Sequence, residues 1–397
     1  MRFIRKSIIG KAIFFLILLL GAVIGGGIYL HRTSVTEVPS DWIMYGVVGL
    51  LLLIFFVFVW DIFVPLARVT KQVTNLLTGK TFKRINPVTI DEVGIFTHFF
   101  NEITQDLEKI SYDIKERRRM SSELDIASSI QRDVLPKEAP EAPGLDVVAK
   151  TRSAAEVGGD NFDFLTSADG NQVFIYIGDV TGHGVPSGLI MMMVDTIVTA
   201  MVYQGVSTGQ ELITHTNFLL HPRISSRLFM TSVMLRWDKS KQQMYYTGAG
   251  HEHVLVYRKD REEVEAIPSG GIALGMIPDV SKIVQEHPIA LEIGDCIVLY
   301  TDGITEAKNQ TGEMYGLDRL QRALKRNGYK PSAETVFDGI TKDFSNFVGE
   351  YVQIDDITMI VIKYMGKDFA SQKVKLTVSK EEAEEGKVKK SRKWDWA

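Results

Sequence analysis

Two long apolar segments near the N-terminus constrain this 397-residue chain more than any other feature of its sequence. Residues 12–30 and 42–60 each form a run of 19 residues without a charged side chain. At about 1.5 Å per residue, a helix of that length spans roughly 28 Å, which matches the hydrocarbon core of a bilayer. Trp42 and Trp60 lie at the ends of the second segment, where interfacial aromatic residues are common. The sequence therefore predicts a two-helix membrane anchor within residues 1–63.

Basic residues flank this pair of segments on its outer sides. Several lysines and arginines precede the first segment and follow the second, whereas the link at 31–41 has Arg32 against Glu37 and Asp41. By the positive-inside rule, both ends of the pair are cytoplasmic, so we expect a multi-pass protein of the inner (cytoplasmic) membrane with its C-terminal bulk in the cytoplasm. A cleaved signal peptide at 1–30 is the alternative, but no small-x-small cleavage pattern follows it.

The next segment has the pattern of two helices joined by an extended link. Apolar residues recur with helical spacing within 66–78, and Gly79 is a suitable helix stop. A second helix is expected from Asp91 and Glu92, whose charges suit a helix N-terminus. Its apolar positions then recur every three or four residues, as in a coiled coil: Val93, Phe96, Phe100, Ile103, Leu107, Ile110 and Ile114.

This arrangement resembles a HAMP domain over residues 64–112. The matching features are Pro65 just after the second apolar segment, the Asp91-Glu92-Val93-Gly94 turn, and the pair Phe100-Asn101. A HAMP domain is a parallel four-helix bundle made by two chains, so the resemblance implies a homodimer. An ordinary amphipathic hairpin beside the membrane is the alternative.

The coiled-coil pattern breaks inside the charged run at 115–119 and restarts in a new phase at Leu124. We interpret 113–136 as a regulatory linker helix, in which a hinge precedes a face that packs on the next domain. Three prolines, Pro136, Pro140 and Pro143, end the helix and mark a domain boundary.

Composition limits what the rest of the chain can be. Charged residues make up 24% of the sequence, and 45 Lys and Arg face 49 Asp and Glu, for a net charge of −4. These values exclude wholesale disorder and argue against a nucleic-acid partner. The single cysteine, Cys296, excludes a disulfide framework and multi-cysteine zinc modules, and we expect it in a strand core. We expect a globular α+β domain at 137–366 and a flexible charged tail at 367–397.

Within this domain, strand-like and helix-like runs are intermingled. The strand-like runs are 145–149, 173–177, 231–236, 244–247, 254–257, 296–300 and 358–362. The helix-like runs are 188–203, 209–220, 316–326 and 332–348.

Four aspartates fall at turns beside these strand-like runs. Asp160 follows two glycines, Asp179 ends an apolar run, Asp302 precedes Gly303, and Asp355 precedes the last strand-like run. Each alone is more commonly a turn residue. If they converge, each pair about 4 Å apart costs roughly 4 kcal/mol at an effective dielectric near 20, so the cluster needs cations or raised pKa values.

Carboxylate oxygens favour Mg²⁺ or Mn²⁺ over zinc. Two such ions about 3.5–4 Å apart can share a water, lower its pKa and clamp phosphate oxygens, so that hydroxide attacks phosphorus in line. The four aspartates together are therefore consistent with phosphate-ester hydrolysis that needs no side-chain nucleophile.

The sequences around these aspartates are GGDNFDF, GDVTGHG, LYTDGITEA and DDIT, in that order. They resemble the RsbU/SpoIIE-type serine phosphatases of the metal-dependent protein phosphatase superfamily. Segments 228–231, 248–251 and 271–275 and the lead-in at 123–136 support the resemblance, which covers about residues 121–364. It implies an α-β-β-α sandwich and hydrolysis of phosphoserine or phosphothreonine on a protein.

Carried over residue by residue, the resemblance implies a set of metal ligands for two Mn²⁺ or Mg²⁺ ions. The carboxylates would be those of Asp160, Asp179, Asp302 and Asp355, and Val180 would offer its backbone carbonyl. These four aspartates are the predicted catalytic residues.

Other residues near these motifs have weaker assignments. Asp356 would support Asp355, and Asp163 would be either an outer support or a structural cap. His183 and His251 could each protonate the leaving oxygen, but the superfamily's proposed acid histidine directly follows the Asp-Gly pair, where this chain has Thr181. A loop-ordering hydrogen bond is the alternative for both histidines. By charge alone, Arg152 is a candidate phosphate contact.

The resemblance also implies a bacterial host and a phosphorylated substrate of the STAS-domain, anti-anti-sigma type, with partner switching as the output and HAMP signalling as the gate. A catalytically inactive scaffold that binds the same partner is the main alternative, and the retention of all four aspartates argues against it. HAMP domains also drive histidine kinases and nucleotide cyclases, but no glycine-rich nucleotide-binding box is evident.

Overall fold

A computed structural model describes residues 8–32, 40–78, 83–86, 91–137, 142–370 and 377–379. The chain divides into two compact units, Met1–Arg119 and Met120–Ala397. The predicted connector near Pro87 and most of the tail lie outside the described residues. Each unit is considered by itself below.

The N-terminal unit is helical in the order that the sequence predicts. Its elements are α1 (Ile8–Arg32), α2 (Ser40–Phe58), a π-helical turn (Val59–Phe63), α3 (Val64–Leu77) and the start of α4 (Glu92–Val134). Leu16 on α1 and Phe55 on α2 are 67% and 65% exposed, and most of their apolar neighbours are exposed as well. An apolar surface of this extent requires a cover other than water.

By length and apolar composition, two helical stretches of the described residues could cross a membrane: Met44–Leu76 and Val185–Tyr203. The second is a core helix of the C-terminal unit, with nine buried residues. Ile13–Tyr29 is apolar but shorter. Composition alone therefore does not distinguish α1 and α2 from a core helix, but their exposed apolar surface does.

Two polar clusters hold the N-terminal unit together. The ammonium group of Lys11 on α1 lies 2.8 Å from the buried carboxylate of Asp91 and 3.3 Å from that of Asp61 in the π-helical turn. The side chain of Asn101 on α4 pairs with both backbone groups of Ile85, at 2.7 and 3.0 Å, and so fixes part of the connector. Both clusters involve residues of the HAMP-like motifs.

Helix α4 is continuous through the charged run where the apolar pattern breaks. The break therefore changes the face of the helix and does not interrupt its backbone. Of the predicted coiled-coil positions, Val93 and Phe100 are buried in this single chain. The others remain exposed: Phe96, Ile103, Leu107, Ile110 and Ile114.

The C-terminal unit contains two packed sheets, as the predicted sandwich requires. In spatial order, the first contains β11 (Thr377–Ser379), β1 (Leu145–Arg152), β10 (Ile357–Tyr364), β9 (Cys296–Tyr300), β6 (Val254–Arg258) and β7 (Glu263–Ile267). The second contains β2 (Asn161–Thr166), β3 (Gln172–Val180), β4 (Met230–Asp238), β5 (Gln243–Ala249) and β8 (Glu286–Ile289). All pairings are antiparallel except that of β1 with β11.

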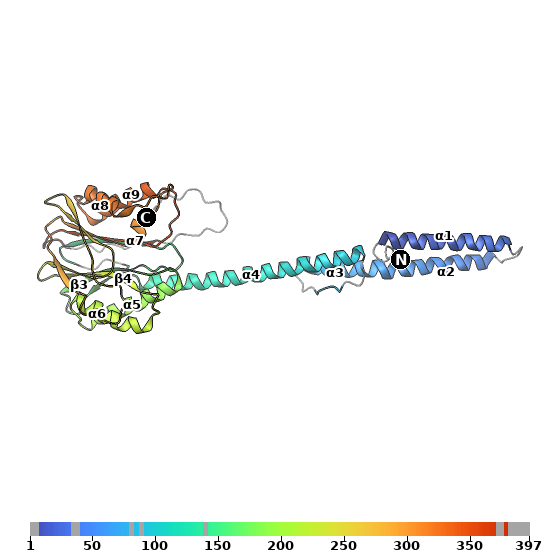
Figure 1. The fold of residues 1–397 in the computed structure, drawn as a ribbon, viewed down its shortest axis with the longest axis horizontal. Helices are drawn as coiled ribbons and strands as arrows, with labels where there is room; N and C mark the ends of the chain where they lie inside the picture. The colour runs from blue at the N-terminus through green and yellow to red at the C-terminus, as the bar shows by residue number, and fades with distance from the viewer. Residues whose placement is uncertain are drawn as a thin grey trace. The chain divides into compact units, whose positions relative to one another are not determined.

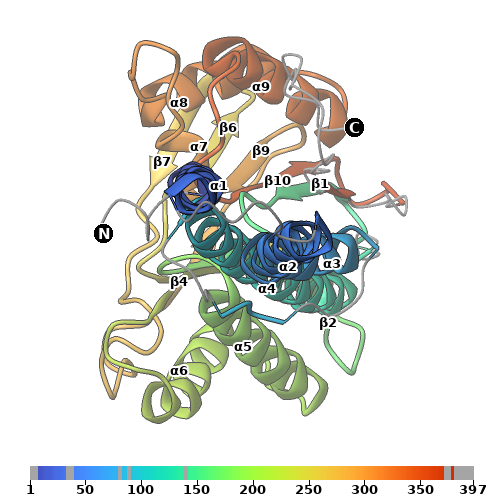
Figure 2. The same cartoon turned by 90° about the vertical axis from the view of Figure 1, so that its right-hand side faces the viewer.

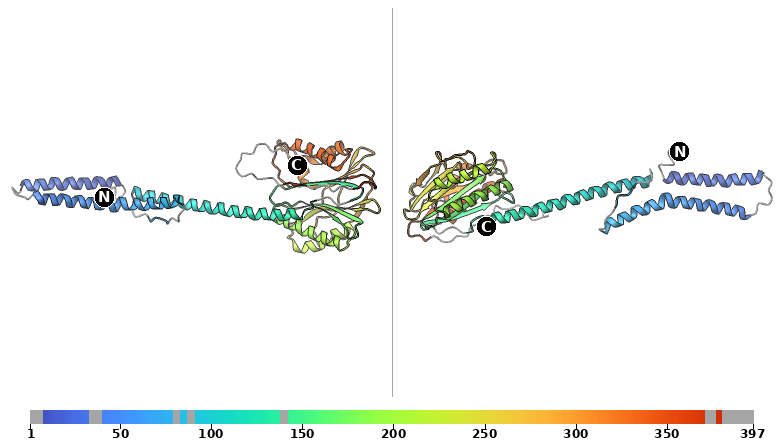
Figure 3. Two further views of the ribbon diagram at one scale, coloured as in Figure 1. Left: turned by 180° about the vertical axis from the view of Figure 1, so that it is seen from behind. Right: turned by 90° about the horizontal axis from the view of Figure 1, so that it is seen from below.

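Helices cover the outer faces of both sheets (Figures 1 and 2). On the first sheet lie α8 (Gly316–Asn327) and α9 (Ala333–Val348), and on the second lie α5 (Val185–Tyr203) and α6 (Gly209–Leu220). The right panel of Figure 3 shows α5 and α6 in green across the second sheet. The predicted α-β-β-α sandwich is confirmed.

Strand periodicity explains this layering. In β9, Ile297 and Leu299 face the core between the sheets, whereas Val298 and Tyr300 face the core under α8 and α9. Cys296 lies in this second core, as expected. Because successive side chains point to opposite faces, a strand buried on both sides must be apolar throughout. That requirement made the central strands recognisable from the sequence.

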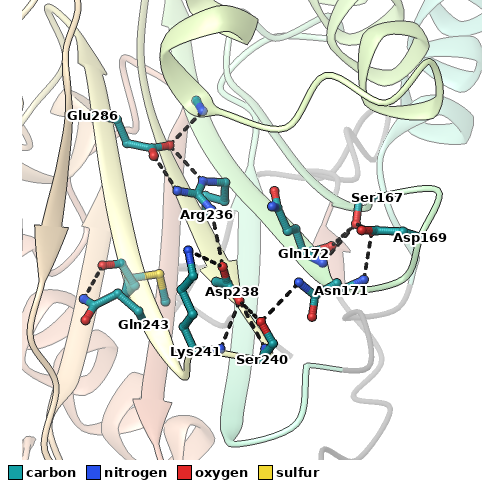
Figure 4. Close-up of polar contacts among 12 residues, drawn as sticks. Ser167, Asp169, Asn171, Gln172, Arg236, Asp238, Ser240, Lys241, Gln243 and Glu286 are labelled. Carbon is teal, nitrogen blue, oxygen red and sulfur yellow. Dashed lines mark hydrogen bonds and ion pairs between the residues drawn. The ribbon is translucent and has the colours of Figure 1, made fainter.

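A charged cluster joins the second sheet to the start of α6 (Figure 4). Arg236 on β4 contacts Glu286 on β8, with its Nε 2.9 Å from the carboxylate, and the same carboxylate accepts the backbone N–H of Gly209. Asp238 accepts hydrogen bonds from the turn at Ser240 and Lys241. The contacts of Glu286 connect β8 with β4, on the other side of β5, and with the start of α6.

Candidate active site

Five strand ends meet at one edge of the sandwich. Antiparallel pairing sets the end of β9 opposite the start of β10, and the start of β10 opposite the end of β1. In the second sheet the start of β2 pairs with the end of β3. Asp160 comes just before β2, Asp355 and Asp356 come just before β10, Asp179 lies near the end of β3, and Asp302 begins the short helix α7 (Asp302–Thr305) after β9.

Asp160 is buried, with 7% of its surface exposed. One of its carboxylate oxygens accepts hydrogen bonds from the hydroxyls of Thr301 (2.9 Å) and Thr358 (2.6 Å), which belong to the other sheet. Burial, followed by the charges of Asp356 and Asp179, holds the pKa of Asp160 well above its ordinary value. The carboxylate is therefore fixed in place at a position where its own charge is unfavourable.

Asp179 and Asp302 show the same electrostatic effect. Burial and the charges of Asp302, Asp355 and Asp356 raise the pKa of Asp179 to about 8. Burial, with Asp355 and Glu306 as the largest charged contributors, raises the pKa of Asp302 to about 6. The side chains predicted from the sequence thus raise one another's pKa values, although they come from different strand ends.

Asp355 and Asp356 have different surroundings despite their adjacency. Asp356 is buried, and its oxygens accept the backbone N–H groups of Ala154 (2.7 Å) and Gly159 (2.6 Å). Burial raises its pKa, although these hydrogen bonds act in the opposite direction. Asp355 is exposed, and its carboxylate accepts the N–H of Asp356. This difference supports Asp355 as the ligand and Asp356 as the support of the loop before Asp160.

Two glycines are required by close approach of the loops. A Cβ added to Gly159 would lie 2.9 Å from the Val180 carbonyl oxygen and 3.4 Å from the Asp179 carboxylate. A Cβ on Gly303 would overlap the carbonyl oxygen of Asp356. These glycines therefore let the loops bring their carboxylates together, and the Val180 carbonyl faces the same space.

The donor set is what a hard divalent cation requires. The largest influences on the pKa values of Asp160, Asp179, Asp302 and Asp356 are burial, other carboxylates and hydrogen bonds, and none comes from a lysine or arginine among the described residues. Within those residues, no three acidic, histidine or cysteine side chains are arranged to hold an ion by themselves. Bridging water and backbone oxygen would therefore complete any ligand set, as is common for Mg²⁺.

The two candidate histidines differ in their surroundings. His251 is half-buried, with Nδ1 2.9 Å from the Thr231 hydroxyl and Nε2 3.1 Å from the Tyr300 carbonyl oxygen. Burial lowers its pKa to about 4, so the ring is neutral near pH 7. Thr231 pairs with Asp179 across β3 and β4, so His251 orders the strand ends and does not carry a spare proton. His183 is exposed in the loop after β3.

Three contacts at the site were not predicted from the sequence. Thr301 and Thr358, which hydrogen-bond to Asp160, are 141 and 198 residues away from it in the sequence. No local sequence pattern predicts contacts between residues so far apart. Gln131 on α4 makes two hydrogen bonds to the backbone of Gly158, at 2.7 and 3.0 Å. The Gln131 contact links the linker helix directly to the loop that carries Asp160.

Comparisons with known proteins agree with this geometry. Residues 169–365 match the family described as Stage II sporulation protein E (SpoIIE). The chain is 28% identical over 251 residues to the phosphoserine phosphatase RsbU of Bacillus subtilis, covering 62% of this chain and 71% of RsbU. It is 26% identical over 202 residues to the phosphoserine phosphatase RsbP of the same organism, covering 50% of this chain and 48% of RsbP.

Two solved structures share the fold. The SiaA-PP2C domain of Pseudomonas aeruginosa superimposes with a TM-score of 0.53 at 22% identity, covering 63% of this chain and 98% of that one. The RsbU and RsbW domains of a Mycobacterium tuberculosis protein give a TM-score of 0.50 at 23% identity, covering 59% and 64%. The C-terminal unit therefore has a PP2C-like fold and is similar to domains of the SpoIIE and RsbU type, and these matches support a protein serine phosphatase.

Proposed function

We propose that this chain is a membrane-anchored bacterial phosphatase that removes phosphate from phosphoserine or phosphothreonine in a regulatory protein. The observation that carries the proposal is the convergence of five aspartates at one edge of the sandwich; four of them, Asp160, Asp179, Asp302 and Asp356, have raised pKa values with no cationic side chain among the main influences. Unrelieved repulsion of this kind destabilises the protein, and a bound cation would relieve it.

Asp160, Asp179, Asp302 and Asp355, with the Val180 carbonyl, would hold two Mn²⁺ or Mg²⁺ ions. When bound, such ions supply an activated water and neutralise charge on the phosphate oxygens. The chain's own contribution is to orient these ligands. Thr301 and Thr358 fix one oxygen of Asp160, and Asp356 holds the backbone of the preceding loop.

The similarity to RsbU and RsbP supports a substrate of the partner-switching kind, and we propose a phosphorylated STAS-domain protein. Dephosphorylation would change which partner that protein binds. A catalytically inactive domain that only binds the same partner is the second candidate, because binding would need the fold but not the carboxylates.

The N-terminal unit would supply the anchor, the dimer and the gate. The exposed apolar surface of α1 and α2 fits lipid, and the exposed coiled-coil positions of α4 fit a second copy of the chain. The pairing of Asn101 with Ile85 supports the HAMP-like helix–connector–helix arrangement. A change in the phase of α4 would reach Asp160 through the Gln131 contact with Gly158.

The test is hydrolysis by the full-length chain in detergent micelles, with p-nitrophenyl phosphate and with a phosphorylated STAS-domain protein as substrates. We expect turnover with Mn²⁺ or Mg²⁺, none with chelator, and none from Asp160→Asn. Ion binding by calorimetry without turnover of either substrate would favour the scaffold.

Inserting one to four residues after Arg117 should change activity periodically with inserted length, and a flat response would contradict gating by helix phase.

A further inference from the structure

A small pocket opens beside the carboxylate cluster and shares residues with it. Its volume is about 100 Å³. Part of its wall is formed by the proposed ligand Asp355 and by Gly303, which follows the proposed ligand Asp302. Val348 and Ile357 are buried in its wall, each 1% exposed. An engineered cavity of roughly 150 Å³ holds a benzene molecule, so this pocket has room for one side chain and not for a helix or a strand.

Three exposed apolar residues line the pocket beside the polar side chains of Glu306, Lys308 and Gln353. Met314, Val352 and Ile354 line or border it with 51%, 71% and 69% of their surfaces exposed. Two of them lie on the segment between α9 and β10, and Met314 lies on the facing loop. Exposed apolar residues that gather around a concave site are typical of a surface that a partner covers.

Both walls of the pocket are held in place by hydrogen bonds. The loop with Met314 is closed by the bond from the Tyr315 N–H to the Ala307 carbonyl, at 2.8 Å, and by a bridge between Lys308 and Met314. On the other wall, the Gln353 side chain donates to the carbonyls of Arg152 and Asp355, at 2.8 Å each. The pocket is therefore preformed, which lowers the entropic cost of filling it.

We infer that this pocket binds one apolar side chain of the protein substrate, within about three residues of the phosphorylated residue. The inference rests on the proposed phosphatase function and adds a determinant of substrate choice. Any phosphoprotein whose phosphate reaches the aspartates must cover the adjacent surface, and Asp355 belongs to both places. An extended chain advances about 3.3–3.6 Å per residue, so a side chain at this pocket comes from close to the phosphoserine.

The experiment uses the full-length chain in detergent with Mn²⁺ and a set of synthetic phosphoserine peptides. Each peptide has an alanine background with a single leucine at one of the three positions before or after the phosphoserine. We expect leucine at one or two of these positions to raise kcat/KM about tenfold, the lower end of what an apolar pocket discriminates. A flat profile across all positions would overturn the inference.

Matched variants localise the effect. Met314→Ser and Val352→Ser should remove the leucine preference while leaving p-nitrophenyl phosphate hydrolysis within about twofold. The control is Ile293→Ser, a residue 62% exposed that precedes β9 and so lies at the end of that strand opposite Asp302. This variant should keep the full leucine preference. Loss of the preference in the control, or its retention in both pocket variants, would contradict the assignment.

Two further outcomes separate the possible failures. If no phosphate ester is hydrolysed under any metal condition, the proposed function is wrong and this inference is wrong with it. The other outcome is that the wild type hydrolyses p-nitrophenyl phosphate, but the pocket variants change peptide hydrolysis only in a chain that retains residues 380–397. In that case the pocket binds the chain's own tail, and only this inference is wrong.

Discussion

The C-terminal unit contains two regions with clustered carboxylates. In one region a cation of the same chain balances their charge, and in the other the carboxylates repel one another. In the Arg236 cluster, the carboxylates of Asp238 and Glu286 are almost buried, with 4% and 12% of their side chains exposed, and a guanidinium lies between them. Burial raises the pKa of Asp238, but hydrogen bonds from Ser240 and Lys241 and the charges of Lys241 and Arg236 outweigh it and lower the pKa overall. At the strand ends, burial and mutual repulsion raise the pKa values of Asp160, Asp179 and Asp302.

The difference shows which region serves the fold. A carboxylate that is paired within the chain stabilises its neighbours at neutral pH, as the Glu286 contacts with Arg236 and Gly209 do for β8 and α6. A carboxylate without such a pair is free to bind a ligand but destabilises the empty protein. Substitutions in the two regions should therefore separate activity from stability.

The largest expected effect is on activity. Asp179→Asn should lower phosphate-ester hydrolysis by more than about 100-fold, the upper end of what loss of an outer support costs. Its melting temperature without metal should equal or exceed that of the wild type, because one member of a repelling set becomes neutral. Steady-state hydrolysis and calorimetric melting measure the two effects. The control is Asp169→Asn in the exposed β2–β3 turn, which should leave activity unchanged; a matching loss in Asp169→Asn would contradict the site.

Breaking the paired region should have the reverse effect. Arg236→Met leaves Asp238 and Glu286 buried without their cation, and removing one partner of a buried pair costs about 3–5 kcal/mol of unfolding free energy. Hydrolysis per folded molecule should stay unchanged well below the melting temperature. Denaturant unfolding followed by fluorescence measures the loss. Arg261→Met removes an exposed pair with Asp260 and should cost less than about 1 kcal/mol, and an equal loss in both variants would argue against the contrast.

Metal binding should reverse the repulsion at the strand ends. At a free Mn²⁺ concentration of 100 times Kd, the wild type should gain about 2.7 kcal/mol of stability, and Arg236→Met should gain the same increment. Asp160→Asn should gain much less. Protons compete with the ions, so the increment should shrink as the pH falls through the pKa values of Asp179 and Asp302, about 8 and 6. An increment independent of pH would exclude these carboxylates as ligands.

The sequence predicted the central strands and the four aspartates because each has a local signal. Strands such as β9 are apolar on both faces, and three of the four aspartates stand beside glycines at strand ends. The strands β7 and β8 were missed because both carry several partly or fully exposed residues and have no apolar run. Strand β2 was missed because it contains Asn161 and Asp163, which are polar but buried.

The sequence predicts a flexible tail at 367–397, yet Thr377–Ser379 pair with β1 as a short parallel strand. Lysine and glutamate dominate the tail at 367–397 as a whole, so its composition did not indicate that a part of it forms a strand. Contacts such as those of Thr301 and Thr358 with Asp160 depend on the packing of one sheet against the other, which no single stretch of sequence specifies. Local pattern therefore located the proposed ligands but not the groups that hold them.

A further acidic pair, Asp163 on β2 and Asp195 on α5, sharpens the comparison because no lysine or arginine is among the main influences on the pKa of either residue. Asp195 accepts a hydrogen bond from the Tyr176 hydroxyl at 2.7 Å, and Asp163 accepts the N–H of Phe164. Burial and then the charge of Asp195 raise the pKa of Asp163 to about 7. The folded state therefore holds a proton that the unfolded chain releases near pH 4, and stability should fall as the pH rises from about 4 to 7.

Asp163→Asn removes the cost of ionising this buried carboxyl group. Its effect should be smaller than those of Asp179→Asn, Arg236→Met and Asp160→Asn. At pH 8 it should be more stable than the wild type by about 1 kcal/mol or more, since a tenfold change in proton affinity between the folded and unfolded states corresponds to about 1.4 kcal/mol, and the advantage should disappear toward pH 4. Urea unfolding at several pH values measures the two slopes. Parallel slopes would mean that Asp163 is already ionised in the fold. A 10- to 100-fold loss of hydrolysis would instead make Asp163 an outer support of the metal site, whereas unchanged hydrolysis assigns it to the structure of β2 alone.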